Sequence, residues 1–167
     1  MRFKYCPDCG SKLTLRELGD EGLVPWCERC DKPWFDVFPC AIIALVHDGN
    51  GNVLLLRQKY ISEKYCNLVS GYITPGESAE ETAIREIFEE TGQKVEELKL
   101  ICTNWFERKQ MMMIGFFARV NPSPLNLSVE VDFAEWVKAT DAPSLVHPQP
   151  TSTSRLLTTL FLSDLNR

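Results

Sequence analysis

Residues 71–93 read GYITPGESAEETAIREIFEETGQ. The opening segment, 70–76, holds two glycines and a proline and predicts a loop. Ser78, with Glu81 three residues later, forms a capping-box pattern, so a helix should begin there. It should run to about Thr91, where a glycine follows. The stretch therefore predicts a glycine-containing loop leading into one amphipathic helix.

Helical geometry of about 100° per residue sorts this helix into two faces. One stripe contains Ile84, Ile87, Phe88 and Thr91. The nearly opposite side carries the carboxylates Glu86, Glu89 and Glu90. We expect the first stripe to pack on a sheet and the carboxylates to converge outward.

Three carboxylates at these spacings repel one another, and each such pair costs a helix a few tenths of a kcal/mol. Hard divalent cations give a reason for the cluster, because Mg²⁺ and Mn²⁺ prefer oxygen ligands and bind phosphates at the same time. Arg85 is spaced to brace Glu89 and to reach back toward Glu77. The competing interpretation of the cluster alone is a solvated acidic helix face.

The stretch also resembles the Nudix hydrolase signature, G-x5-E-x7-R-E-U-x-E-E-x-G-U, where U is a bulky aliphatic residue. Only Gln93, at the last U, departs from it. The resemblance implies a Nudix-type α/β/α sandwich with a mixed sheet, and hydrolysis of a nucleoside diphosphate linked to another group. It implies catalytic roles for Glu77, Arg85, Glu86, Glu89 and Glu90, and Mg²⁺ or Mn²⁺ binding by the three helix glutamates and the Gly71 carbonyl.

Nudix proteins often place a further acidic metal ligand on a later loop. We expect Glu130 here, because residues 130–137 resemble the family's late segment. Glu107 and Asp132 are the other candidates, and for each of the three a plain surface carboxylate is the competing interpretation.

Hydrophobic patterning outside the helix predicts a mixed α/β fold. A turn, DGNGN at 48–52, should join two strands into a hairpin. The expected strands are Phe38–Val46, Val53–Tyr60, Val95–Phe106, Met111–Val120 and Phe133–Val137. An amphipathic helix is expected over 151–165.

Four cysteines form two C-x-x-C pairs near the N-terminus: Cys6, Cys9, Cys27 and Cys30. Their spacing is that of a structural zinc site with four thiolates. Apolar residues are too sparse here for a core, so bound zinc should supply stability. Two disulfides or a redox pair are the alternatives. We expect a zinc ribbon over 1–35 and a Nudix hydrolase domain over 36–167.

The 167-residue chain carries a formal charge of −5. A net negative charge does not provide the basic surface that general nucleic-acid binding needs, so a nucleic-acid partner is not expected. No apolar run is long enough to span a membrane. An odd cysteine count without a secretory signal predicts a reducing, cytoplasmic location. A small nucleotide is the expected partner, and a homodimer is compatible with the sequence.

A zinc ribbon before a Nudix domain resembles the NADH pyrophosphatase branch. We expect no counterpart of that branch's extra N-terminal domain, and TNWF at 103–106 stands where its S-Q-P-W-type motif would be. Trp105 or Phe106 could stack on a nucleobase, with core packing at a strand end as the alternative. The expected substrates are NADH-like or ADP-ribose-like. The alternative function is a nucleotide-sensing module whose ribbon docks a protein or RNA.

Overall fold

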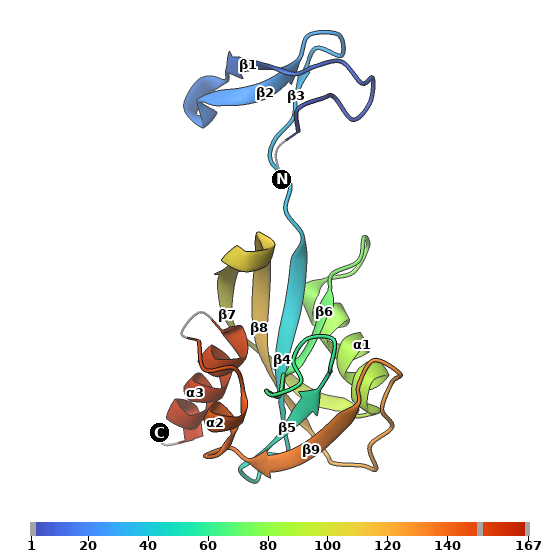
Figure 1. The fold of residues 1–167 in the computed structure, drawn as a ribbon, viewed down its shortest axis with the longest axis vertical. Coiled ribbons are helices and arrows are strands. Elements are labelled where there is room, and N and C mark those ends of the chain that lie inside the picture. The colour runs from blue at the N-terminus through green and yellow to red at the C-terminus, as the bar shows by residue number, and fades with distance from the viewer. Residues whose placement is uncertain (1–2, 150–151, 166–167) are drawn as a thin grey trace. The chain divides into compact units, whose positions relative to one another are not determined.

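The computed structural model describes residues 3–149 and 152–165. The chain divides into two compact units, Met1–Phe38 and Pro39–Arg167 (Figure 1). Within the described residues, no helix is long and apolar enough to cross a membrane.

The N-terminal unit is built on a three-stranded antiparallel sheet. Its strands are β1 (Thr14–Glu17), β2 (Leu23–Cys27) and β3 (Lys32–Pro33), in the order β1-β2-β3, with a 3₁₀ turn η1 (Gly19–Glu21) between the first two. Gly10 follows the first cysteine pair with a φ of 72°, a conformation open to glycine at no steric cost.

The second unit is organised around a six-stranded mixed sheet. Its order is β7-β8-β4-β5-β9, and β6 pairs with β4 beside this path. The central pair β4 and β8 is parallel, and the other pairs are antiparallel. The strand bounds are β4 Cys40–His47, β5 Asn52–Arg57, β6 Val69–Tyr72, β7 Val95–Phe106, β8 Met111–Val120 and β9 Phe133–Lys138.

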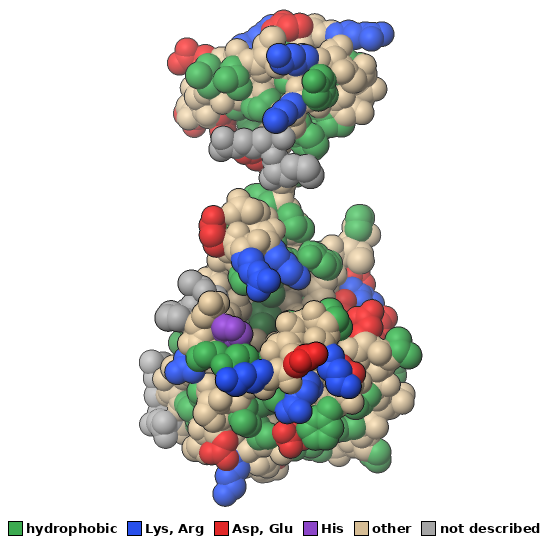
Figure 2. Space-filling view, viewed as in Figure 1, with side chains coloured by type: hydrophobic (Ala, Val, Ile, Leu, Met, Phe, Trp, Pro, Cys, Tyr) green, Lys and Arg blue, Asp and Glu red, His purple; other side chains and the backbone are tan. Residues whose placement is uncertain are grey.

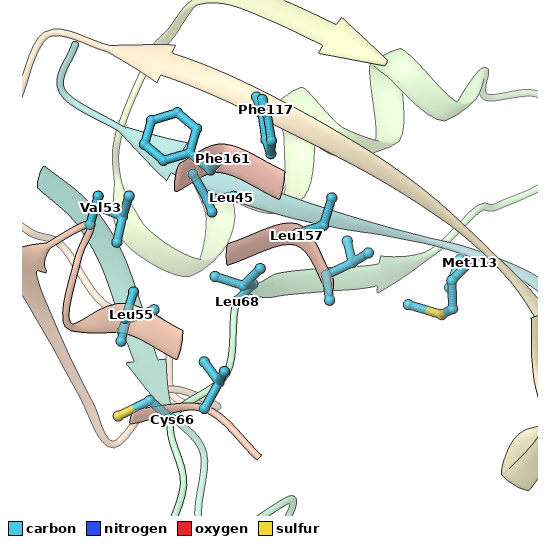
Figure 3. Close-up of a cluster of buried hydrophobic side chains, with 14 of the residues drawn as sticks. Leu45, Val53, Leu55, Cys66, Leu68, Met113, Phe117, Leu157 and Phe161 are labelled. Atoms are coloured by element: carbon cyan, nitrogen blue, oxygen red, sulfur yellow. The ribbon is translucent and has the colours of Figure 1, made fainter. Parts of the chain in front are cut away.

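Helices cover both faces of this sheet (Figure 1). On one face α1 (Ala79–Thr91) packs through Ala83 and Ile87 against even-numbered residues of β4. On the other face lie α2 (Ala142–Leu145) and α3 (Thr153–Leu165). Figure 3 shows Leu157 and Phe161 of α3 among the buried side chains of this face, which include Leu45 of β4 and Phe117 of β8. This arrangement confirms the predicted α/β/α sandwich.

A short 3₁₀ turn, η2 (Glu107–Lys109), joins β7 to β8.

The ends of α1 lie where the capping pattern predicts. The Ser78 side chain accepts a hydrogen bond from the Glu81 N–H at 3.1 Å, and Glu81 accepts from the Ser78 N–H at 2.8 Å. Gly92 closes the helix in the left-handed region, with a φ of 74°. Local hydrogen-bonding chemistry determines both ends, which is why the sequence predicts them well.

Two sequence-based expectations around α1 are wrong. Ile84 and Phe88 do not pack on the sheet, because their side chains are 46% and 52% exposed. The buried face is rotated instead toward Ile87 and Glu90, so a carboxylate points inward. The segment expected as a loop from residue 70 is also partly a strand, β6, because Val69–Tyr72 pairs in register with β4.

Candidate active site

Arg85 is the centre of a carboxylate network on α1. It holds Glu77 with two hydrogen bonds, from Nε at 2.7 Å and from Nη2 at 2.9 Å. Its Nη1 donates to Glu86 at 2.8 Å and to Glu89 at 3.0 Å. One guanidinium therefore fixes the loop before the helix and two of the helix carboxylates.

Glu77 receives further support from threonine hydroxyls. Thr74 and Thr82 donate to its Oε2 at 2.7 and 3.1 Å. Arg85 first, and then these hydroxyls, lower the pKa of Glu77 to about 2. Glu77 is thus a permanent anion that locks the loop and the helix together at neutral pH.

Gly71 lies directly against Glu86. A Cβ built on Gly71 would overlap Cδ and Oε1 of Glu86. The φ of Gly71 is outside the left-handed region, so a side chain here would conflict with Glu86 through space alone and would displace its carboxylate. Strand β6 and helix α1 therefore approach closely enough to bring the Gly71 backbone beside the Glu86 carboxylate.

Glu90 is the most deeply placed of the three helix carboxylates, with 4% of its surface exposed. Gln58 donates from Nε2 to Glu90 Oε1 at 3.0 Å, and no well-formed hydrogen bond reaches Oε2 from the part of the chain that the structure describes. The Ser70 backbone lies close enough to lower the pKa of Glu90 slightly, against the larger effect of burial. Burial and then the charge of Glu86 raise the pKa of Glu90 to about 8. Burial also raises the pKa of Glu86, against the opposing effect of Arg85.

These features fit a divalent cation. A buried, unpartnered carboxylate oxygen and a second half-buried carboxylate are the donors that hard cations prefer. Glu89 is exposed and adds a third carboxylate through its contact with Arg85. The structure brings together Gly71, Glu77, Arg85, Glu86, Glu89 and Glu90, and their chemical roles remain predictions.

Of the three later acidic candidates, Glu130 is the one among the main causes that raise the pKa of both Glu86 and Glu90, after burial. Asp132 instead accepts a hydrogen bond from the Lys59 N–H at 2.7 Å. Glu107 accepts one from the Trp105 indole at 2.8 Å. Electrostatics therefore favour Glu130 as the additional ligand.

A hollow of about 520 Å³ is lined by Lys59, Tyr60, Val129, Glu130 and Asp132, and it includes the carboxylate whose charge acts on Glu86 and Glu90. The Tyr60 ring is 70% exposed. Partial burial, and then the charges of Glu130, Glu90 and Glu86, raise the pKa of its hydroxyl. Sequence reasoning missed Gln58 and Tyr60 because both fell inside a strand expected to continue to residue 60, whereas β5 ends at Arg57.

Trp105 and Phe106 lie at the end of β7 and differ in environment. Phe106 packs partly against the core beneath α3, as the core-packing alternative predicts. Trp105 is 40% exposed, with its indole N–H bonded to Glu107. Only Trp105 thus offers a substantial ring surface, and its contact with substrate remains a prediction.

The four N-terminal cysteines converge in the first unit. Their sulfur atoms all lie within 4.8 Å of one another. The Sγ–Sγ distances are 3.5 Å for Cys9 and Cys27 and 3.9 Å for Cys6 and Cys30. Four thiolates around one zinc ion would lie about 3.8 Å apart at ordinary Zn–S distances. Contact with Ser11 lowers the pKa of Cys9 to about 6, and the hydrogen bond with Cys9 in turn raises the pKa of Cys30 to about 12, so the four thiols influence one another strongly. The donor set fits a tetrahedral thiolate site.

The NUDIX domain model matches residues 37–158, most of the chain. The chain belongs to the Nudix family. Its Nudix motif keeps every charged position and both glycines and departs from the pattern only at Gln93. Gln93 is fully buried, and its amide pairs with both the N–H and the carbonyl of Ser123 at 3.0 Å. The departure therefore serves to anchor the following loop.

Among curated relatives of this Nudix chain is the NAD-capped RNA hydrolase NudC of Pseudomonas putida (strain GB-1). It is 27% identical over 161 residues, which cover 96% of this chain and 56% of the relative. The human NAD-capped RNA hydrolase NUDT12 is 28% identical over 145 residues, covering 81% of this chain and 31% of the relative. The chain spans about half the length of NudC and less of NUDT12.

Solved Nudix structures share the fold. The NUDIX hydrolase of Nitrosomonas europaea superposes with a TM-score of 0.68 at 19% identity, covering 86% of this chain and 83% of the other. The NUDIX domain of Shewanella oneidensis NrtR, complexed with ADP ribose, gives a TM-score of 0.61 at 18% identity, covering 84% and 94%. At these identities the likeness establishes the architecture alone.

Proposed function

We propose that this chain is a divalent-metal-dependent pyrophosphohydrolase that cleaves the diphosphate linkage of a nucleoside diphosphate derivative. The observation that carries the proposal is the packing of Glu86 on Gly71, with Glu90 buried behind it and Arg85 bracing the cluster. A solvated acidic face would not bury a carboxylate, whereas here Glu90 is buried and Glu86 lies directly against the Gly71 backbone. The arrangement supports a built cation site.

Glu86, Glu89 and Glu90 would hold Mg²⁺ or Mn²⁺, with the Gly71 carbonyl and Glu130 completing the ligands. When bound, such ions neutralise the diphosphate and make water a better nucleophile at neutral pH. A glutamate of the cluster accepts the proton of the attacking water. The water oxygen bonds to phosphorus, the bridging P–O bond breaks, and two monophosphates leave.

The Tyr60 hollow supports placing the rest of the substrate beside the carboxylates. An exposed aromatic ring suits stacking on a nucleobase, and Trp105 is the second candidate ring. NADH-like and ADP-ribose-like substrates share an adenosine diphosphate, so this surface suits either. We place Tyr60, which sequence reasoning did not identify, ahead of Phe106 as a substrate contact.

The relatives' names add a nucleic acid to the candidate substrates, since NudC and NUDT12 are NAD-capped RNA hydrolases. The net charge taken alone argues against a nucleic-acid partner, so the relatives' names widen that expectation. Within the Nudix unit, Figure 2 shows acidic and basic side chains interspersed on the face in view. We therefore propose that a capped RNA would be recognised mainly through its dinucleotide end, with few contacts along the strand.

For the N-terminal unit we propose one structural zinc bound by Cys6, Cys9, Cys27 and Cys30. The convergence of four sulfurs in a unit with few buried apolar side chains supports this assignment. Four protein ligands leave no open position on the metal, so the site would stabilise the ribbon and take no part in hydrolysis.

A substrate panel tests the activity. NADH, NAD⁺, ADP-ribose, nucleotide sugars, nucleoside triphosphates and NAD-capped RNA are incubated with Mg²⁺ or Mn²⁺, and again with excess chelator. We expect monophosphate products from at least one diphosphate-linked compound, lost with chelator and restored by metal. Metal-dependent binding without any product would instead favour the nucleotide-sensing module.

A further inference from the structure

Gln58 is a buried polar residue at the end of β5, with 1% of its surface exposed. Its backbone is held in place, because its carbonyl accepts hydrogen bonds from the N–H groups of Ile61 and Ser62 at 2.9 and 3.0 Å. The neighbouring Lys59 N–H is bonded to Asp132 at 2.7 Å. The Gln58 side chain therefore extends from a backbone position that hydrogen bonds hold in place.

That side chain reaches the deepest carboxylate of the site. Gln58 Nε2 donates to Glu90 Oε1 at 3.0 Å, although the two residues are 32 positions apart. Glu90 Oε2 has no hydrogen-bond partner among the described residues. The contact thus restrains one carboxylate oxygen and leaves the other available.

The amide is chemically suited to this task. Glu90 faces the like charges of Glu86 and Glu130, and Gln58 is the side chain that donates to it. A neutral donor restrains the carboxylate without cancelling the charge that attracts a cation. A lysine or arginine in its place would form an ion pair and compete with the metal.

We propose that Gln58 is a positioning residue that orients Glu90 toward the divalent cation. This inference rests on the proposed function only in taking Glu90 as a metal ligand. Residues that hydrogen-bond to a metal ligand commonly set metal affinity by 10- to 100-fold. Gln58 therefore tunes the metal site without touching metal or substrate.

The chain offers a matched control. Gln93 is a second fully buried glutamine of the same unit, but it pairs with Ser123 rather than with the carboxylate cluster. Gln58→Met and Gln93→Met make the same change of side chain. Mn²⁺ affinity is measured by calorimetric titration without substrate, with thermal unfolding followed in parallel. We expect affinity to fall roughly 10-fold or more in Gln58→Met and to stay within about twofold in Gln93→Met.

A double-mutant cycle tests whether the effect passes through Glu90. In a Glu90→Gln background, Gln58→Met should weaken Mn²⁺ binding no further. If Gln58→Met does not fold, Gln58→Asn replaces it, since the shorter side chain withdraws the donor while remaining an amide. The proposal is overturned if the Gln58 variant binds Mn²⁺ like wild type while Glu90→Gln does not, or if both glutamine variants lose affinity equally. Unchanged Mn²⁺ binding in Glu90→Gln would overturn the metal site itself, and this inference with it.

Discussion

Arg85 and Glu77 show how single residues prepare the site. The bidentate contact, with hydroxyls from Thr74 and Thr82, favours the charged form of Glu77 in the folded state. A carboxyl whose pKa is depressed by folding stabilises the protein above its unfolded pKa, about 4.3 for glutamate, and loses that contribution as pH falls toward the folded value.

We therefore expect Glu77→Gln to lower the thermal midpoint near pH 7. The difference from wild type should shrink between about pH 4 and pH 2, as Glu77 becomes protonated in both folded and unfolded wild type. Midpoints followed by circular dichroism across this range measure the effect. A difference that stays constant with pH would contradict the assignment of Glu77 as the anion of this network.

The helix carboxylates carry the second prediction at this scale. Glu86→Gln, Glu89→Gln and Glu90→Gln remove charge with little change of volume, so the fold should survive. Turnover on the best substrate should fall by about 10²-fold or more. Glu80→Gln is the matched control, an exposed carboxylate in the first turn of the same helix, and should retain activity. Near wild-type turnover in all three site variants would remove the carboxylates from the mechanism.

At the scale of elements, the approach of β6 to α1 builds the site. Gly71→Ala leaves an allowed backbone conformation but places a methyl group on the Glu86 carboxylate. We expect the variant to lose Mn²⁺ affinity and turnover together, whereas Ser70→Ala on the same strand should lose little. Affinity and turnover equal to wild type in Gly71→Ala would mean that the close contact has no functional role.

The same elements show which features of the fold can be predicted from the sequence and which cannot. Ser78, Glu81 and Gly92 mark the helix ends because capping is local chemistry. Helical periodicity placed Ile84 and Phe88 on the buried face, because it assumes that all three carboxylates face solvent. In the fold, tertiary packing buries Glu90 and leaves Ile84 and Phe88 exposed. The role of Gln58 has no local signal, because it depends on a partner that only the fold brings near.

At the scale of the whole molecule, the two units are stabilised in different ways. The Nudix unit has buried hydrophobic clusters, whereas the N-terminal unit should depend on bound zinc. The cysteine unit buries few apolar side chains, so removing a zinc ligand should unfold it. We expect about one zinc per chain by elemental analysis, lost in Cys27→Ser. Cys40→Ser is the control, because this half-buried cysteine lies in the Nudix unit, and should keep the zinc. Zinc-free wild-type protein with a disulfide among the four cysteines would contradict the assignment.

The central claim is hydrolysis at phosphorus of a diphosphate linkage. It is tested most directly by running the reaction in ¹⁸O-labelled water, with NADH or ADP-ribose and Mg²⁺ or Mn²⁺, and analysing the products by mass spectrometry. The account predicts two monophosphates, one of them AMP, with one ¹⁸O atom in a product phosphate and none in a sugar hydroxyl. Label in the sugar, or metal-dependent binding of every nucleotide tested without any labelled phosphate, would contradict it.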